Sequence, residues 1–257
     1  MSPGRRKVPF ANRCIEGKCA LPFGAIHILA RAPTLPADDF RIDIDLDQAA
    51  REAERVRTWL TALRRRHDLS RYEYTRFVRI VPASTTHSHP ILTLGTRFTD
   101  SEDQLLATYL HEQMHWYLYQ LGGPDHDPIE PFFDELVRRY PQAPTRLPEG
   151  ARSYEQTYVH LVVCFLELMV TAEFIGRARA FALAETVYGY RWIYRTVVAD
   201  WSALEALFTA HGILPIKPAS AFAKTNGGQK KTPAKAPATR ARKARRKPRA
   251  RGGRSAD

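Results

Sequence analysis

Residues 101–123, SEDQLLATYLHEQMHWYLYQLGG, constrain the fold most, because they predict a helix that is apolar around most of its circumference. Ser101 and Gln104 form the pattern of a capping box at its start, and Gly122–Gly123 ends it. A helix of about 20 residues is roughly 30 Å long. We expect this one to be buried over most of its surface by the rest of the domain.

Two histidines, His111 and His115, share one face of this helix, because four residues at about 100° each leave them only about 40° apart. That spacing lets both imidazoles reach one zinc ion at about 2.0–2.1 Å. Glu112 lies about 100° further round. It would flank the ion and act as general base toward a zinc-bound water. The sequence therefore predicts an H-E-x-x-H zinc site, and the alternative is a pair of core histidines satisfied by other polar groups.

A second helix, predicted to start at Ser153 with Gln156 as its capping partner, supplies the candidates for a third ligand, since zinc enzymes usually bind the ion through three protein groups. Its core, VHLVVCFLELMV, is almost wholly apolar but carries His160 and Glu167 on one face, about 10.5 Å apart along the axis. We favour His160 as the ligand, with Glu167 accepting the other ring N–H of a ligating histidine. The reverse assignment, and a His160 that only bonds a backbone carbonyl, remain open, with Glu155, Glu173 and His126 as further candidates.

The other patterns predict a small α+β domain. AIHILA (25–30) reads as a strand, residues 45–69 as a helix, and residues 71–83 and 89–98 as two strands. FFDELVRRY predicts a short helix, and residues 182–212 predict one or two more. The apolar stripe of the first helix comprises Ala49, Ala53, Val56, Leu60 and Leu63. We divide the chain into an irregular basic segment 1–24, one domain 25–222 and a disordered tail 223–257.

The net positive charge of the chain lies in the tail, residues 223–257, and not in the preceding residues. The chain has 257 residues and a net charge of +12. Residues 223–257 contain thirteen Lys and Arg and one Asp, so the tail alone accounts for +12 and residues 1–222 sum to zero. The three cysteines, Cys14, Cys19 and Cys164, are too few and too scattered for a disulfide framework. We see no signal peptide and no apolar run of about 18 residues, so we expect a cytoplasmic protein without a membrane partner.

The residues His111, Glu112 and His115 resemble the zinc-binding motif of the zincin metallopeptidases, especially the small cytosolic members without a prodomain. The resemblance covers residues 72–121 and, more loosely, 153–176. It implies a zincin-like fold: a small, mostly antiparallel sheet, an active-site helix packed beneath it and a C-terminal helical part. It also implies that ILTLGT (91–96) lines the substrate cleft. The metzincin extension and the Glu-x-x-x-Asp of the thermolysin-like group are both missing, so no single family within the zincins is indicated.

The tail resembles the Lys/Ala/Pro tails of linker histones and bacterial nucleoid proteins. A flexible segment with this density of positive charge binds the phosphate backbone of nucleic acids without sequence specificity. Binding to DNA would associate the protein with the nucleoid. The alternative is a solubilising extension. A zincin body with such a tail is similar to the Spartan-like proteases that act on DNA-bound proteins, although the chain lacks their Cys-rich zinc ribbon. The candidate nucleic-acid-binding residues are Lys230, Lys231, Arg240, Arg242, Lys243, Arg245, Arg246, Lys247, Arg249 and Arg251.

Three functions are consistent with these features. The first is a zinc-dependent hydrolase, a metallopeptidase with a peptide or protein substrate, in which Glu112 is the general base. The second is a non-enzymatic nucleic-acid-associated protein with a zincin-like body. The third is a degenerate zincin fold that serves as a protein-interaction module. Glu112 favours the enzyme, because a structural zinc site needs no base beside its histidines.

Overall fold

The computed structural model describes residues 40–44, 50–97, 99–123 and 129–223. The predicted strand 25–30, the segment 1–24, His126 and the tail beyond Ala223 lie outside these residues. The elements in chain order are β1 (Arg41–Ile44), α1 (Ala50–Arg66), the 3-10 helix η2 (Leu69–Tyr72), β2 (Phe77–Val81), β3 (Leu92–Gly95), α2 (Glu102–Leu121), α3 (Glu130–Arg139), α4 (Tyr154–Ile175), α5 (Arg177–Thr186), α6 (Arg191–Ala199), α7 (Trp201–Ala210) and α8 (Ala219–Ala223).

The mixed helix-and-sheet class is confirmed, but the strand directions are not those we predicted. The sheet has the order β1-β2-β3, and both pairs of strands are parallel. The connection between β2 and β3 explains this, because it runs back beside β3 before that strand begins. His87 in the connection pairs antiparallel with Thr93, with N···O distances of 3.0 and 2.8 Å. The return segment takes the antiparallel position, which leaves β3 to run in the same direction as β2.

Both predicted strands are shorter in the structure. Residues 69–72 form η2 in place of strand, and the Asp68 side chain accepts a hydrogen bond from the backbone of Ser70. The alternation of Tyr72 and Tyr74 therefore reflects burial of both rings outside the sheet. At the end of β3 the backbones come very close. A Cβ on Gly95 would lie 2.0 Å from the carbonyl oxygen of Ser84, so only glycine fits there.

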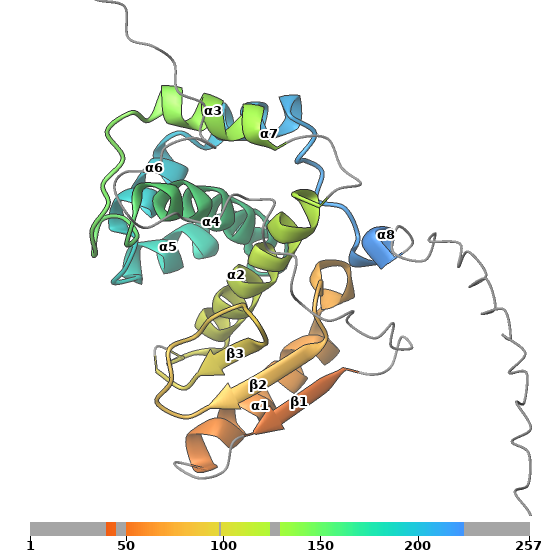
Figure 1. Cartoon of the computed structure of the whole chain (residues 1–257). Coiled ribbons are helices and arrows are strands. Elements are labelled where there is room, and N and C mark those ends of the chain that lie inside the picture. Colours follow the sequence, from red (N-terminus) through yellow and green to blue (C-terminus); the bar gives the residue numbers. More distant parts are fainter. Residues whose placement is uncertain (1–39, 45–49, 98, 124–128, 224–257) are drawn as a thin grey trace, which may run out of the picture.

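Helix α1 packs against the sheet, and the predicted apolar stripe is its buried face. Ala53, Val56, Leu60 and Leu63 are all buried, while Ala49 lies outside the described residues. Helix α2 crosses between this sheet layer and the helices α3 to α7, which form the other part of the molecule (Figure 1). Its N-terminus is capped as predicted by Ser101, whose hydroxyl accepts the Gln104 N–H at 3.2 Å. The Gln104 side chain bonds the N–H of Asp100 and not that of Ser101.

Helix α4 is the centre of the helical part. Ser153 caps it as predicted, by accepting the N–H of Gln156 at 3.1 Å. Contrary to our expectation from apolar runs, α4 is long and apolar enough to cross a membrane by length and composition alone. In this structure it packs against α2, α5 and α6. Burial in a protein core accounts for its apolar composition equally well.

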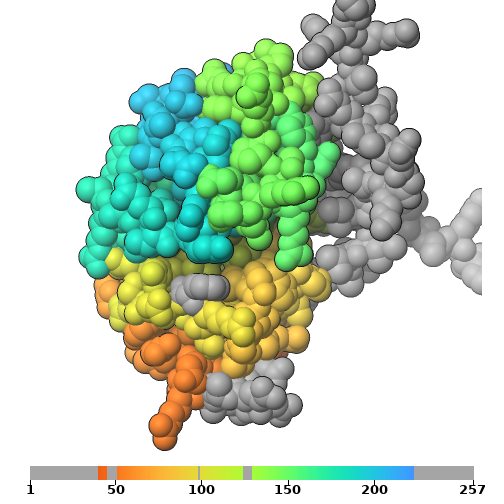
Figure 2. Space-filling model, turned by 90° about the vertical axis from the view of Figure 1, so that its left-hand side faces the viewer, coloured from red at the N-terminus to blue at the C-terminus, as the bar shows by residue number. Residues whose placement is uncertain are grey.

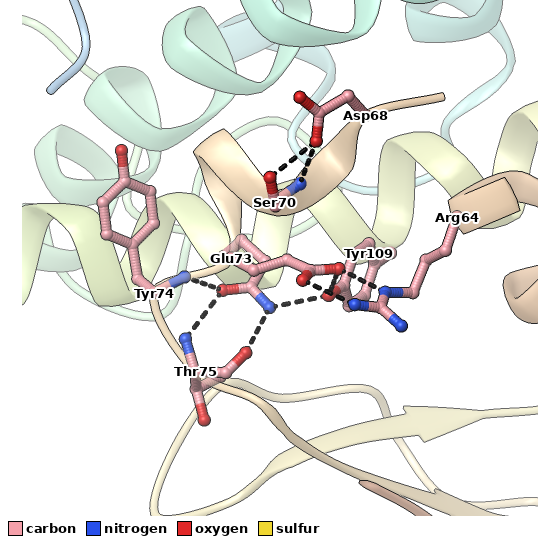
Figure 3. Close-up of polar contacts among 8 residues, drawn as sticks. Arg64, Asp68, Ser70, Glu73, Tyr74, Thr75 and Tyr109 are labelled. Carbon is pink, nitrogen blue, oxygen red and sulfur yellow. Dashed lines mark hydrogen bonds and ion pairs between the residues drawn. The ribbon is translucent and has the colours of Figure 1, made fainter. Parts of the chain in front are cut away.

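A buried polar network fixes the rotation of α2 about its axis (Figure 3). Arg64 of α1 makes two contacts with the Glu73 carboxylate, at 2.6 and 3.0 Å, and the Tyr109 hydroxyl donates to Glu73 at 3.1 Å. Gln113, one turn further along α2, accepts the backbone N–H groups of residues 74 and 75, at 2.8 and 3.1 Å, and donates to the Thr75 carbonyl at 2.9 Å. Tyr109 and Gln113 lie about 160° from His111. By holding this side of α2 against residues 73–75, they turn the histidines toward the opposite side.

Candidate metal centre

Helices α2 and α4 bring His111, His115 and His160 together. One ring nitrogen from each lies within 4.8 Å of the others. The ring centroids are 5.0 Å apart for His111 and His115, 5.1 Å for His115 and His160, and 5.8 Å for His111 and His160. A tetrahedral ion with bonds of about 2.0–2.1 Å separates its ligands by roughly 3.4 Å. Small side-chain rotations are therefore enough to close the three rings on one ion.

Hydrogen bonds select the nitrogen that His111 and His160 offer to a metal. His160 Nδ1 lies 2.8 Å from the carbonyl oxygen of Gln156, and His111 Nδ1 lies 3.0 Å from Oε2 of Glu167. A carbonyl and an ionised carboxylate only accept, so each Nδ1 carries the proton. When each ring is neutral, its lone pair is therefore on Nε2. Metal-binding histidines are usually oriented in this way.

The electrostatics of the three rings favour neutral ligands at two positions. Burial lowers the pKa of His115 well below its usual range, and the neighbouring His111 and His160 rings lower it further. Burial, together with His111, lowers the pKa of His160 to about 4. At His111 burial also acts to lower the pKa, but contacts with Cys164 and Glu167 outweigh it and hold the pKa well above the usual range. Metal binding at neutral pH would thus displace a proton from His111 alone.

Glu112 is a buried carboxyl that follows His111 in α2. Its side chain is 6% exposed, and it has no hydrogen-bond partner among the residues that the structure describes. Burial raises its pKa to about 7, although the positive charges of His111 and His87 act in the opposite direction. A group with a pKa near neutrality can both take up and release a proton at physiological pH.

Further donor groups line the buried side of His111. Cys164 and Glu167 form with His111 a second set of donor atoms within 4.8 Å of one another. The hydroxyl of Tyr194 in α6 donates to the same Glu167 oxygen at 2.7 Å. Cys164 lies one turn from His160 and one turn from Glu167, so helical periodicity could have placed it on this face. Nothing in the sequence could have brought Tyr194 here, because α6 reaches the site only through tertiary packing.

Tyr190, at the N-terminus of α6, covers His160. The two ring centroids are 4.3 Å apart, and the Tyr190 ring is nearly parallel to that of His111 at 6.4 Å. Tyr190 has φ 60° and ψ 31°, a left-handed conformation that is costly for a tyrosine. The N–H groups of Arg191 and Trp192 bond the carbonyls of Pro148 and Glu149 at 2.8 and 3.0 Å, which holds this turn in place. Strained residues of this kind concentrate at functional sites.

Strand β3, which contains most of ILTLGT, is the outer strand of the sheet. Its four residues are buried, and the edge segment, residues 86–88, is joined to it by the bridge between His87 and Thr93. That ILTLGT lines a substrate cleft stays a prediction. A 3.0 Å hydrogen bond from Trp116 Nε1 to the Ser88 carbonyl attaches the edge segment to α2. Figure 2 shows the face on which the β2–β3 connection lies below and the segment between α3 and α4 lies above. His87 is exposed and lies close enough to Glu112 to affect the pKa of that carboxyl.

The structure thus brings three of the predicted residues to one place: His111, His115 and His160. Glu112 follows His111 in α2, and the charges of these two side chains interact. Glu167 contacts the far nitrogen of His111, as the favoured assignment required. Glu173 is exposed and accepts the hydroxyl of Tyr72 at 2.7 Å, so it does not belong to this site.

No family model matches the chain, and neither a curated protein nor a solved structure matches it.

Proposed function

We propose that this chain is a zinc-dependent hydrolase that cleaves peptide bonds. The observation that carries the proposal is the convergence of His111, His115 and His160, with the buried carboxyl of Glu112 next to His111. Three neutral imidazoles with one coordination position left for water or substrate are typical of catalytic zinc sites, whereas structural sites have four protein ligands.

The donor set fits Zn²⁺ well. Two of the three rings offer Nε2, and the third, His115, has a lowered pKa that leaves it neutral at physiological pH. Imidazole nitrogen is a preferred ligand of zinc. A zinc ion held here would supply a Lewis acid that polarises a carbonyl and acidifies a water molecule.

The chain's own groups would perform the proton transfers. Glu112 takes a proton from the attacking water and later gives it to the leaving amine, which its pKa of about 7 allows in both directions. Tyr190 keeps its proton at neutral pH, because burial raises the pKa of its hydroxyl. From its position over His160, this hydroxyl can donate to the negative charge that develops on the carbonyl oxygen.

The edge segment favours a peptide as substrate. His87 uses both its N–H and its C=O on Thr93, so in an antiparallel pair the backbone polar groups of Thr86 and Ser88 point away from β3. Trp116 occupies the Ser88 carbonyl. The remaining groups can pair with an extended polypeptide laid along this edge, close to Glu112.

Zinc analysis and a Glu112→Gln variant test the proposal together. Protein purified without added metal should contain one zinc per chain, and the His111→Ala/His115→Ala double variant should contain none. Glu112→Gln should keep the zinc but lose hydrolysis of an unfolded protein such as reduced casein, because a general base contributes to the transition state and not to metal binding. Near-stoichiometric zinc in the double variant, or unchanged hydrolysis by Glu112→Gln, would refute the proposal.

The basic tail supports a second, separate activity. Residues 223–257 carry thirteen Lys and Arg against one Asp, and we propose that they bind nucleic-acid phosphates without sequence preference. In a non-enzymatic protein this binding would be the whole function. The placement of Glu112 next to His111 in the three-histidine cluster favours a hydrolase that the tail brings to nucleic acid.

A further inference from the structure

A chain of buried hydrogen bonds starts at the side of His111 that faces away from the other two histidines. His111 Nδ1 donates to Oε2 of Glu167 at 3.0 Å, and the Tyr194 hydroxyl donates to the same oxygen at 2.7 Å. Glu167 is 3% exposed and Tyr194 is 6% exposed, so water does not readily substitute for either partner. Three helices take part, since His111 lies in α2, Glu167 in α4 and Tyr194 in α6.

The direction of each bond follows from the chemistry of the groups. An ionised carboxylate can only accept, so the hydroxyl of Tyr194 must be the donor. Bonds to an ionised acceptor are about twice as strong as bonds between neutral groups. Among the described residues, Tyr194 supplies the only hydroxyl that bonds Glu167. Without it, the carboxylate would keep one partner, His111, and would be free to rotate about its last side-chain torsion.

We infer, on the basis of the zinc site proposed above, that Tyr194 is a positioning residue for the metal: it holds Glu167 in the orientation that keeps His111 Nδ1 protonated and Nε2 directed at the ion. Tyr194 itself does not touch the metal or the substrate. Its effect on the metal passes through Glu167. The losses of zinc affinity caused by changing Tyr194 and by changing Glu167 should therefore not add.

A chelator competition measures the effect as zinc affinity. Loss of a partner that orients a metal ligand typically costs about 10–100-fold in affinity. Glu167→Gln should fall in this range, and Tyr194→Phe should weaken zinc binding by about 10-fold. The double variant should bind zinc little more weakly than Glu167→Gln alone, because the Tyr194 hydroxyl donates to that carboxylate, and its other contact is the Cys164 thiol, a weak hydrogen-bonding group.

Tyr117→Phe is the matched control. Tyr117 is also fully buried in α2, and its hydroxyl donates one hydrogen bond, to the Ile213 carbonyl at 2.7 Å. Both Tyr→Phe variants lose one buried hydroxyl with two contacts, Glu167 and Cys164 for Tyr194 and the backbone of Ile213 and Lys217 for Tyr117, so both should lose similar stability in urea unfolding. Only Tyr194→Phe should lose zinc affinity. Equal zinc affinity of Tyr194→Phe and Tyr117→Phe would overturn the inference. So would a double variant in which the losses of zinc affinity from Tyr194→Phe and Glu167→Gln add.

A measurement on the unaltered protein covers the case in which Tyr194→Phe does not fold. The buried hydroxyl protons of Tyr194 and Tyr117 should exchange slowly enough to be seen by proton NMR. Zinc addition should shift the Tyr194 resonance and leave that of Tyr117 in place, whereas an unshifted Tyr194 resonance would overturn the inference. The proposed hydrolase fails in a different way, through zinc that survives in the His111→Ala/His115→Ala variant.

Discussion

Replacing Glu112 with glutamine should stabilise the zinc-free protein, and by an amount that depends on pH. Burial raises the pKa of this carboxyl from its usual 4.5 to about 7. The folded state therefore holds the proton more tightly than the unfolded chain does. Ionisation of Glu112 costs folding free energy that is absent below pH 4.5, grows between pH 4.5 and 7, and is complete above pH 7.

The magnitude follows from this change in pKa. At 1.36 kcal/mol for each pKa unit, ionisation of the buried carboxyl costs about 3 kcal/mol. Glutamine has nearly the same shape and no charge, so it avoids the cost. We expect Glu112→Gln to be about as stable as the wild type near pH 4.5, and more stable by up to about 3 kcal/mol at pH 8.

Urea unfolding in the presence of a chelator, at pH 5 and at pH 8, checks this expectation. Glu205→Gln serves as the control, because Glu205 is exposed on α7, and its stability difference should not change with pH. A Glu112→Gln difference that is the same at both pH values would show that the carboxylate is well solvated when the protein is folded. The reason for assigning it a pKa suited to a general base would then be lost.

Four further outcomes are expected. His160→Ala should abolish zinc binding at micromolar concentrations while Glu167→Gln weakens it by only about 10–100-fold, and the reverse order in a chelator competition would make Glu167 the ligand. Tyr190→Phe should keep zinc but lower kcat by about 10²–10³ in steady-state kinetics, and an unchanged kcat would remove its proposed contact with the transition state. Cobalt-substituted protein should have the same near-ultraviolet spectrum with and without Cys164→Ser, because Cys164 is not a ligand in the three-histidine site. A thiolate-to-cobalt band in the wild type that Cys164→Ser removes would place the ion between His111, Cys164 and Glu167 instead. Truncation after Phe222 should abolish salt-sensitive binding to DNA and leave the zinc content unchanged, and DNA binding that survives truncation would assign it to the body.

The local pattern of the sequence was enough to locate the helices that carry the site. Ser101 and Ser153 cap α2 and α4 as predicted, because capping depends only on residues within one turn. Helical periodicity likewise placed His111 and His115 on one face, and His160 and Glu167 on another, since 3.6 residues per turn hold in any helix. The sequence alone therefore determined which side chains each helix could present together.

Pairing between distant segments was decided only by the tertiary structure. The parallel direction of β3 depends on the segment around His87, which runs back past Thr93 before β3 begins. The alternation of side chains along a strand does not encode this direction, because the alternation is the same for parallel and antiparallel neighbours. The contact of Glu167 with the far side of His111, and the arrival of Tyr190 and Tyr194 on either side of the histidines, depend on how α4 and α6 pack against α2. Helix packing is set by the shapes of many side chains at once, so no spacing within one segment can predict it.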